Sequence, residues 1–292
     1  MGSGYWEQIA ILICINAIIA LGFYTTFLTG QLSAAHAAFM GIGAYCAGLL
    51  TMKAGVPFVP AAFAGALLAA VAAALLVSAL RRLSGMFLAI ATLAFAEVVI
   101  ITLKNTRALG GALGLTGVPL AMTFWHAAAV LAVLVVVFLR LENTRLGLGF
   151  RAIRDDAKAA AASGIEVLQM RIVAFAAGGF LCGLGGALQI HYLGVMEPDE
   201  LGFAMTVSLL LYVVVGGRDY FLGPILGAAI FTVLPELLRV SSRGRLLIFS
   251  AILILIVILR PDGLVRRPVF WHCWRSRRDA NGATNGGSTR AN

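Results

Sequence analysis

Long apolar runs separated by short polar links dominate this sequence. They cover residues 6–28, 33–52, 57–80, 86–103, 124–139, 172–195, 201–217, 220–238 and 246–259. A helix that crosses the hydrocarbon core of a bilayer needs about 20 residues, and at least about 17. Five runs meet this length comfortably, and those beginning at Met86, Phe124, Leu201 and Leu246 are marginal. We therefore expect an all-α, polytopic helical membrane protein with about 8–10 transmembrane helices, one or two of them broken or re-entrant.

Composition excludes the common alternatives. Only 12% of residues are charged and 61% are hydrophobic, against about a quarter charged in a soluble domain. So little charge cannot cover a soluble globule of 292 residues, and so apolar a chain is not disordered as a whole. A water-soluble enzyme is therefore excluded.

The excess of basic residues indicates orientation. The net charge is +9, and most Lys and Arg residues fall on one side if residues 140–171 are placed in the cytoplasm and the runs alternate from there. Such loops suit the lipid of an anionic cytoplasmic leaflet better than nucleic acid. We expect a transmembrane domain over residues 1–264 and a basic, disordered cytoplasmic tail over residues 265–292.

The sequence carries no recognisable catalytic or nucleotide-binding motif. A Walker A loop needs Gly-Lys followed by Ser or Thr, and none of Lys53, Lys104 and Lys158 follows a glycine. The four cysteines have no CxxC spacing, and neither HExxH nor GxSxG occurs. We expect no enzymatic activity, no cofactor and no metal site. If transport is driven by ATP, another chain must hydrolyse it.

The long loop at residues 140–171 is the most informative polar segment. Its composition predicts a short helix from Arg151 to Ser163, ended by Gly164. Four charged residues, Arg151, Arg154, Asp155 and Lys158, would share one face of it. The other face is nearly all alanine, so the helix could lie deep in a partner's groove and receive a rigid-body push. An ordinary solvated connecting helix is the alternative on composition alone.

This loop and four other motifs resemble one family. The motifs are Arg151–Asp155 with Ala159, Ala160, Gly164 and Ile165; Gly30–Ser33 with His36–Tyr45; Phe87–Glu97; Gly216–Gly217 with Gly223–Pro224 and Gly227–Ala228; and Leu259–Leu264. Together they resemble the M-type permease subunit of branched-chain amino acid ABC importers. One departure is Lys158, where the broader importer pattern has a Glu before the paired alanines.

The resemblance implies function and partners. It implies a permease in the bacterial inner membrane for branched-chain amino acids or related small polar solutes (urea, amides, aromatic acids). It also implies a second, H-type permease, two cytoplasmic ATPases and a periplasmic substrate-binding protein. The loop helix, including Ala159, Ala160 and Gly164, would couple the ATPases to the spans. A charge reversal at Arg154 is then expected to weaken ATPase association.

Candidates for the translocation pathway lie within the apolar runs. Glu97 stands in mid-run, so we expect it to face the bundle interior or a water cavity, where it lines the route or bonds a neighbouring helix as the neutral acid. His36 opens the second run, as an interhelical hydrogen-bonder or a substrate ligand. Glycines at four further positions mark either close packing or broken helices beside a cavity: Gly41, Gly43, Gly216 and Gly217.

Two further hypotheses remain open. Glu197, Asp199 and Glu200 form a short acidic outer loop that either docks the substrate-binding protein or is a solvated turn. The rival function is a secondary transporter or channel that uses Glu97 for proton or ion coupling. Uptake by the isolated chain along an ion gradient would distinguish it from an importer subunit.

Overall fold

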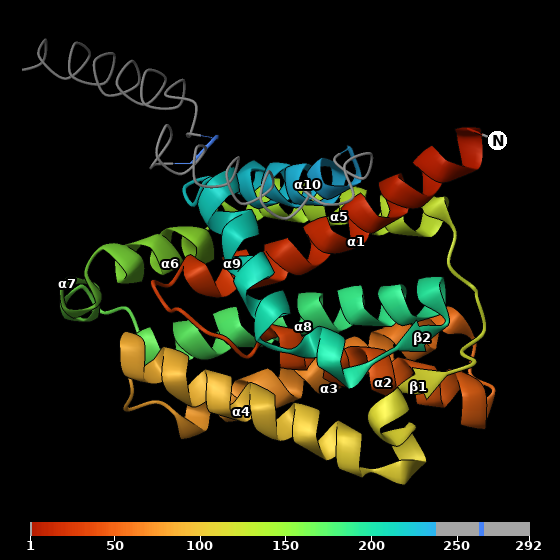
Figure 1. The fold of residues 1–292 in the computed structure, drawn as a ribbon. Helices are drawn as coiled ribbons and strands as arrows, with labels where there is room; N and C mark the ends of the chain where they lie inside the picture. The colour runs from red at the N-terminus through yellow and green to blue at the C-terminus, as the bar shows by residue number, and fades with distance from the viewer. Residues whose placement is uncertain (1, 238–262, 266–292) are drawn as a thin grey trace, which may run out of the picture.

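The structure is a computed structural model in which residues 2–237 and 263–265 are described. It is a bundle of helices whose long axes run broadly between two ends (Figure 1). The main helices are α1 (Gly2–Phe27), α2 (His36–Ala54), α3 (Phe58–Ala79), α4 (Met86–Asn105), α5 (Phe124–Leu141), α8 (Val167–Leu193), α9 (Phe203–Gly216) and α10 (Leu222–Leu237). Shorter elements are η1 (Arg107–Leu109), η2 (Gly111–Leu113), β1 (Leu115–Thr116), α6 (Arg145–Asp155), α7 (Ala157–Ala162), β2 (Val195–Met196) and η3 (Pro198–Leu201).

The expectation of a polytopic helical membrane protein is confirmed. Six helices, α1 to α5 and α8, are long and apolar enough to cross a membrane, and α9 and α10 are shorter apolar helices. The eight described helices match the first eight apolar runs. The ninth run, residues 246–259, and the expected tail beyond residue 265 lie outside the described residues.

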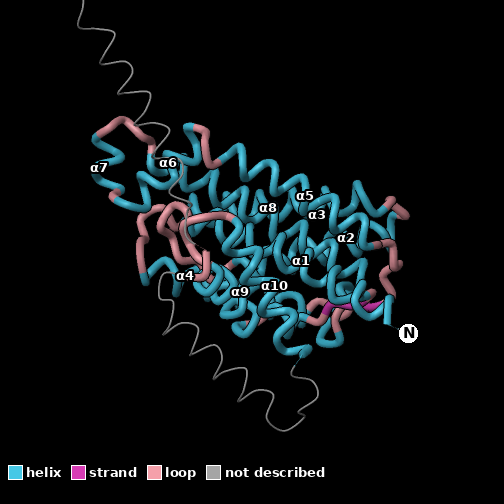
Figure 2. The backbone as a smooth tube through the Cα atoms, turned by 90° about the horizontal axis from the view of Figure 1, so that it is seen from above, coloured by secondary structure: helices cyan, strands magenta, loops and turns pink. Residues whose placement is uncertain are grey.

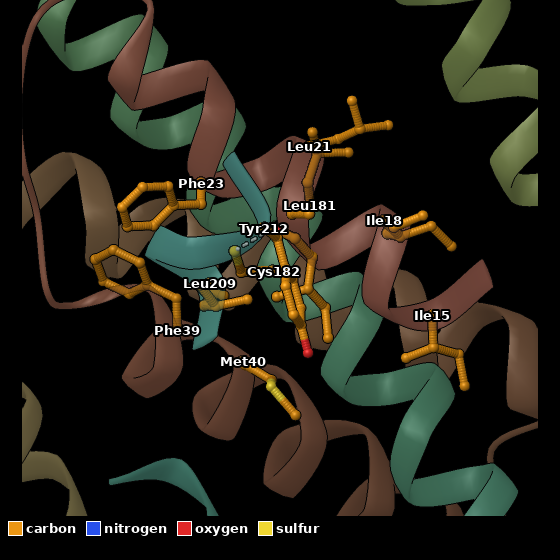
Figure 3. Packing of buried hydrophobic residues seen from close by; sticks show 14 of the residues in the cluster. Ile15, Ile18, Leu21, Phe23, Phe39, Met40, Leu181, Cys182, Leu209 and Tyr212 are labelled. Atoms are coloured by element: carbon orange, nitrogen blue, oxygen red, sulfur yellow. Dashed lines mark hydrogen bonds between the residues drawn. The ribbon is translucent and has the colours of Figure 1, made fainter. Parts of the chain in front are cut away.

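Small residues allow the central helix α8 to pack closely. It lies against α1, α2 and α3. A Cβ built on Gly43 of α2 would lie 2.2 Å from the carbonyl oxygen of Gly183 in α8, so the two backbones almost touch. Because α2 continues unbroken through Gly41 and Gly43, the broken-helix alternative is wrong at these two glycines. Figure 3 shows the apolar side chains of α1, α2, α8 and α9 meeting in one cluster, including Ile18, Met40, Leu181 and Tyr212.

The two ends of the bundle carry different loops. One end holds the turns after α1, α3, α5 and α9 together with α6 and α7, and lies on the left of Figure 1. The other holds the turns after α2, α4 and α8, including β1 and β2. The first contains the basic loops that the charge bias places in the cytoplasm. We call it the inner end and the second the outer end.

Between α1 and α2 the chain is non-helical over residues 28–35. The N–H of Ala34 donates to Thr92 Oγ1 of α4 at 2.9 Å, and its carbonyl accepts from Thr206 Oγ1 of α9 at 3.2 Å. Thr92 is the seventh residue of α4, about 9 Å along that helix. The segment therefore enters the depth of the spans, where non-helical backbone must be satisfied by protein or water.

Candidate coupling and pathway sites

The loop after α5 forms two helices where a single one is predicted. α6 ends at Asp155 and α7 begins at Ala157. Asp156 separates them because its extended backbone leaves the helix and its carboxylate accepts from the N–H groups of Lys158 (2.8 Å) and Ala159 (3.1 Å). The expected end at Gly164 is confirmed, with φ +84° just after α7. The prediction that four charged residues share one helical face is wrong, because Lys158 lies in α7 whereas Arg151, Arg154 and Asp155 lie in α6.

Arg151 points into the protein. Its guanidinium lies 3.2 Å from the Glu142 carboxylate at the end of α5, and both side chains are largely buried, with 12% and 7% exposed. The same carboxylate accepts from the backbone N–H of Phe221, in the turn before α10, at 3.3 Å. Glu142 thus joins α5, α6 and the α9–α10 turn, a role that no sequence motif had indicated.

Arg154 makes a second link to the α9–α10 turn. Its guanidinium donates to the carbonyl of Arg218 at 3.2 Å and lies 3.4 Å from the Asp219 carboxylate. A weaker contact, 3.6 Å, joins it to Asp155 on its own helix. Its backbone also packs against Gly30, whose built Cβ would lie 3.2 Å from Arg154 Cα. Arg154 therefore connects α6 to both the segment after α1 and the turn after α9.

α7 is an exposed and projecting part of the loop. Lys158, Ala159, Ala161 and Ala162 are exposed, whereas Ala160 is buried. α7 projects beyond the other described helices at the inner end in both views (Figures 1 and 2). Its short alanine side chains leave the helix backbone accessible to a partner.

Glu97 lies on the outer surface of α4. Its side chain is exposed, and among the described residues the structure records no hydrogen bond or ion pair for it. The expectation that it faces the interior of the bundle is wrong for the single subunit, because Thr92, Ala96 and Ile100 form the buried stripe of α4 instead. A carboxylate at this depth costs about 2.5–3.5 kcal/mol in lipid, so it requires water or another protein.

His36 is fully buried where α1, α2 and α8 meet. Its Nε2 lies 3.1 Å from Thr26 Oγ1, and its Nδ1 lies 3.3 Å from the carbonyl of Ser33. Phe23, Phe39 and Phe175 surround the ring. These contacts favour the interhelical role over the ligand role. His191, to which the sequence assigned nothing, similarly joins α8 to α2 through Thr51 Oγ1 at 2.9 Å.

Gly216 and Gly217 form a tightly packed turn. α9 ends at Gly216, and a Cβ there would lie 1.9 Å from the carbonyl oxygen of Gly223 at the start of α10. Gly217 has φ +118°, a conformation that glycine adopts readily. The N–H groups of Leu264 and Val265 donate to the carbonyls of Val215 and Gly216, each at 3.0 Å. These glycines therefore permit a close turn between α9 and α10.

The acidic outer loop is part of an ordered outer end. Asp199, in η3, forms an ion pair with Lys104 near the end of α4. Glu197 and Glu200 are exposed, and partial burial followed by the nearby Glu197 raises the pKa of Glu200. β1 pairs antiparallel with β2, and Tyr45 Oη donates to the Met196 carbonyl at 2.9 Å. Asp199 is thus already paired, and Glu197 and Glu200 remain available on the surface.

Lys104 connects α4, the helix that carries Glu97, to the acidic outer loop. Lys104 follows Glu97 by seven residues, so both lie on the same face of α4, about 10 Å apart along its axis. Because Lys104 reaches Asp199 in η3, which leads directly into α9, this face of α4 turns toward the start of α9. Among residues 2–237 and 263–265, no cluster of His, Cys, Asp or Glu could hold a metal ion.

The fold defines the class: a polytopic helical membrane protein with a short helical projection at its inner end. The chain belongs to the family described as "Branched-chain amino acid transport system / permease component", whose model matches residues 5–259. The resemblance expected from the sequence motifs is thereby confirmed.

Individual relatives agree with this assignment. The chain is 30% identical to the high-affinity branched-chain amino acid transport system permease protein LivM of Escherichia coli, over 88% of this chain and 69% of that protein. It is 26% identical to the corresponding LivH permease of Salmonella typhimurium, over 49% of this chain and 46% of that protein. It is 29% identical to the fructose import permease protein FrcC of Rhizobium meliloti, over 46% and 39% respectively. No solved structure shows significant similarity.

Proposed function

We propose that this chain is the M-type permease subunit of a bacterial inner-membrane ABC importer for branched-chain amino acids or related small polar solutes. The observation that carries the proposal is the family match over residues 5–259, within which the spans and the projecting loop fall. An H-type permease, two cytoplasmic ATPases and a periplasmic substrate-binding protein would complete the importer. ATP would be hydrolysed by the ATPases, and this subunit would provide part of the route.

α7 is the proposed contact with an ATPase. It projects at the inner end and exposes Lys158 and three alanines. Arg154 would not contact the ATPase directly. Its guanidinium binds Arg218 and Asp219 and would link α6 to the α9–α10 turn. Movement of α7 and α6 would then reach the α9–α10 turn through Arg154 and Glu142, and two arrangements of the spans would give alternating access.

Glu197 and Glu200 are the proposed contacts with the substrate-binding protein. Both are exposed on the outer end, on a loop held by β2 and by the Lys104–Asp199 pair. Exposed charges of this kind mainly set the association rate and its dependence on salt. Asp199 would hold the loop rather than contact the partner.

Reconstitution tests the function as a whole. In liposomes, the chain with its second permease and ATPases should take up labelled leucine only when ATP and the binding protein are present. Parallel assays with urea, an amide and an aromatic acid would define the substrate class. Uptake by the isolated chain along a proton or sodium gradient would instead support the secondary-transporter alternative and overturn the importer assignment.

Charge reversals test the two docking surfaces. Lys158→Glu on α7 should reduce co-purification of the ATPases, whereas Arg82→Glu, an exposed reversal elsewhere at the inner end, should not. Glu197→Lys with Glu200→Lys should slow association of the binding protein, with Glu7→Lys at the exposed start of α1 as the control. Equal effects of test and control variants would refute the assigned surface.

A further inference from the structure

The outward faces of the spans differ in one respect. The spans of α3 and α5 carry no charged residue over residues 58–79 and 124–139. The exposed face of α4 contains Glu97 between apolar residues such as Ile90 and Ile101. Lipid can solvate the first two faces, but it solvates a carboxylate at mid-span poorly.

A second observation falls on the same side of the molecule. Residues 28–35 are non-helical, and Ala34 is held between Thr92 of α4 and Thr206 of α9. Leu32 in this segment is 44% exposed. Non-helical backbone is not found in contact with lipid, so this part of the surface also requires cover by protein or water.

We propose that the α4 face bearing Glu97, together with residues 28–35, is the surface that this subunit presents to the second permease subunit, with the solute route between them. This proposal rests on the proposed function and adds which face of the subunit contacts the second permease. The Glu97 side of α4 turns toward the start of α9, as the Lys104–Asp199 ion pair shows. The route would therefore have Glu97 on one wall, and Leu32 of the non-helical segment would line the covered surface nearer the inner end.

Charge complementarity specifies the partner's chemistry. The exposed α4 face is broad and apolar around the carboxylate of Glu97, so its partner is an apolar helix that offers water access or a hydrogen-bond donor opposite Glu97. The second permease fits, because the chain is similar to both LivM and LivH, two separate permease proteins. At the outer end the route would be narrowed by the Lys104–Asp199 pair, which joins α4 to η3, the element that precedes α9.

Site-directed photo-crosslinking in the assembled transporter tests this assignment. Benzoylphenylalanine would be placed at Ile90 or Ile101 of α4, and at Val133 of α5 or Leu67 of α3 as matched controls. All four side chains are exposed and apolar, so none of the substitutions should prevent folding. The α4 positions should yield a band whose mass equals the sum of the two permeases, and the controls should not.

The outcomes separate this inference from the proposed function. If the second permease co-purifies but crosslinks form from Val133 or Leu67 and not from α4, the face assignment is wrong. Crosslinks from α4 to lipid alone, or to a second copy of this chain, would also overturn it. If no second permease co-purifies with the chain, the importer assignment itself fails.

A second readout addresses the route. Glu97→Cys in the same complex should react with a membrane-impermeant, positively charged thiol reagent during ATP turnover, and the reaction should abolish uptake. Val133→Cys should remain unmodified, and the wild-type chain provides the background of its native cysteines. Lack of reaction at Glu97→Cys in a complex that transports leucine would refute water access to this face.

Discussion

The inner and outer ends of the bundle hold the same helix, α9, by different means. At the outer end, β1 pairs with β2 through backbone bonds, and the exposed Lys104–Asp199 pair joins α4 to η3 just before α9. At the inner end, a buried ion pair joins α5 to α6, and a half-buried pair joins α6 to the turn just after α9, beside backbone bonds from Leu264 and Val265 to the end of α9. Backbone pairing fixes a position, whereas side-chain ion pairs can break and re-form. The comparison therefore indicates that the contacts of α6 at the inner end can change while the backbone bonds at both ends of α9 stay in place.

The largest effect is expected at the buried pair of the inner end. Glu142→Ala would leave the Arg151 guanidinium buried without its counter-charge, which typically costs about 3–5 kcal/mol. Thermal unfolding of the purified chain in detergent would measure the loss. Because Arg151→Met removes the stranded charge, the double variant should recover much of the stability. A double variant as unstable as Glu142→Ala alone would show that the ion pair is not the cause.

At the outer end, stability should be most sensitive to substitutions that disturb the backbone around the β1–β2 pair. Gly114 has φ +76°, and a Cβ there would lie 2.3 Å from the Met196 carbonyl oxygen. Gly114→Val should cost about 2–4 kcal/mol from conformational strain and overlap. Gly117 has φ +81° but nothing within 4 Å of a built Cβ, so Gly117→Val should show the strain alone, about 1–2 kcal/mol. Equal losses in thermal unfolding would mean that the β1–β2 contact is not rigid.

Arg154 distinguishes structure from coupling. Its pair with Asp219 is partly exposed, so Arg154→Gln should cost at most about 1 kcal/mol of stability. In the complete transporter the same variant should retain the ATPases but reduce leucine uptake per ATP hydrolysed, because α6 loses its link to the α9–α10 turn. The exchange Arg154→Asp with Asp219→Arg should restore part of the uptake. Loss of the ATPases from the Arg154→Gln complex would instead support the original expectation that Arg154 contacts them directly.

The sequence predicts the spans better than the sites. Continuous apolar runs report burial in lipid or protein directly, so eight described helices match eight predicted runs. The prediction of one continuous loop helix is wrong at Asp156, because the carboxylate of this residue caps a new helix where composition alone would continue the first one. The sequence wrongly places Glu97 inside the bundle. Periodicity shows which residues share a helical face, but it does not show whether that face packs against the same chain or against another protein. The Glu142–Arg151 pair joins residues from two elements that no pattern relates.

The exposed pair at the outer end should contribute less than its inner counterpart. Asp199 is 72% exposed and Lys104 35%, and such pairs typically contribute about 0.2–1 kcal/mol. A double-mutant cycle with Lys104→Gln and Asp199→Asn, read by thermal unfolding, should give a coupling energy in this range that falls when salt is raised. The Glu142–Arg151 coupling should change little with salt because both side chains are buried. A salt-insensitive outer pair would reverse this distinction between the ends.

The smallest effect concerns pH at the same outer loop. Partial burial and Glu197 raise the pKa of Glu200, so the folded chain holds this proton more tightly than the unfolded chain. The contribution of Glu200 to the free energy of unfolding is therefore fully present below the ordinary pKa of a glutamate, about 4.3. It is lost as the pH rises through the raised pKa of the folded chain. Glu200→Gln should then be slightly more stable than wild type at pH 7, by about 0.3 kcal/mol or less because solvent screens the exposed carboxylate, and this advantage should vanish near pH 4. Thermal unfolding at both pH values tests it, and a variant less stable than wild type at pH 7 would show that ionised Glu200 makes a favourable contact within the outer end.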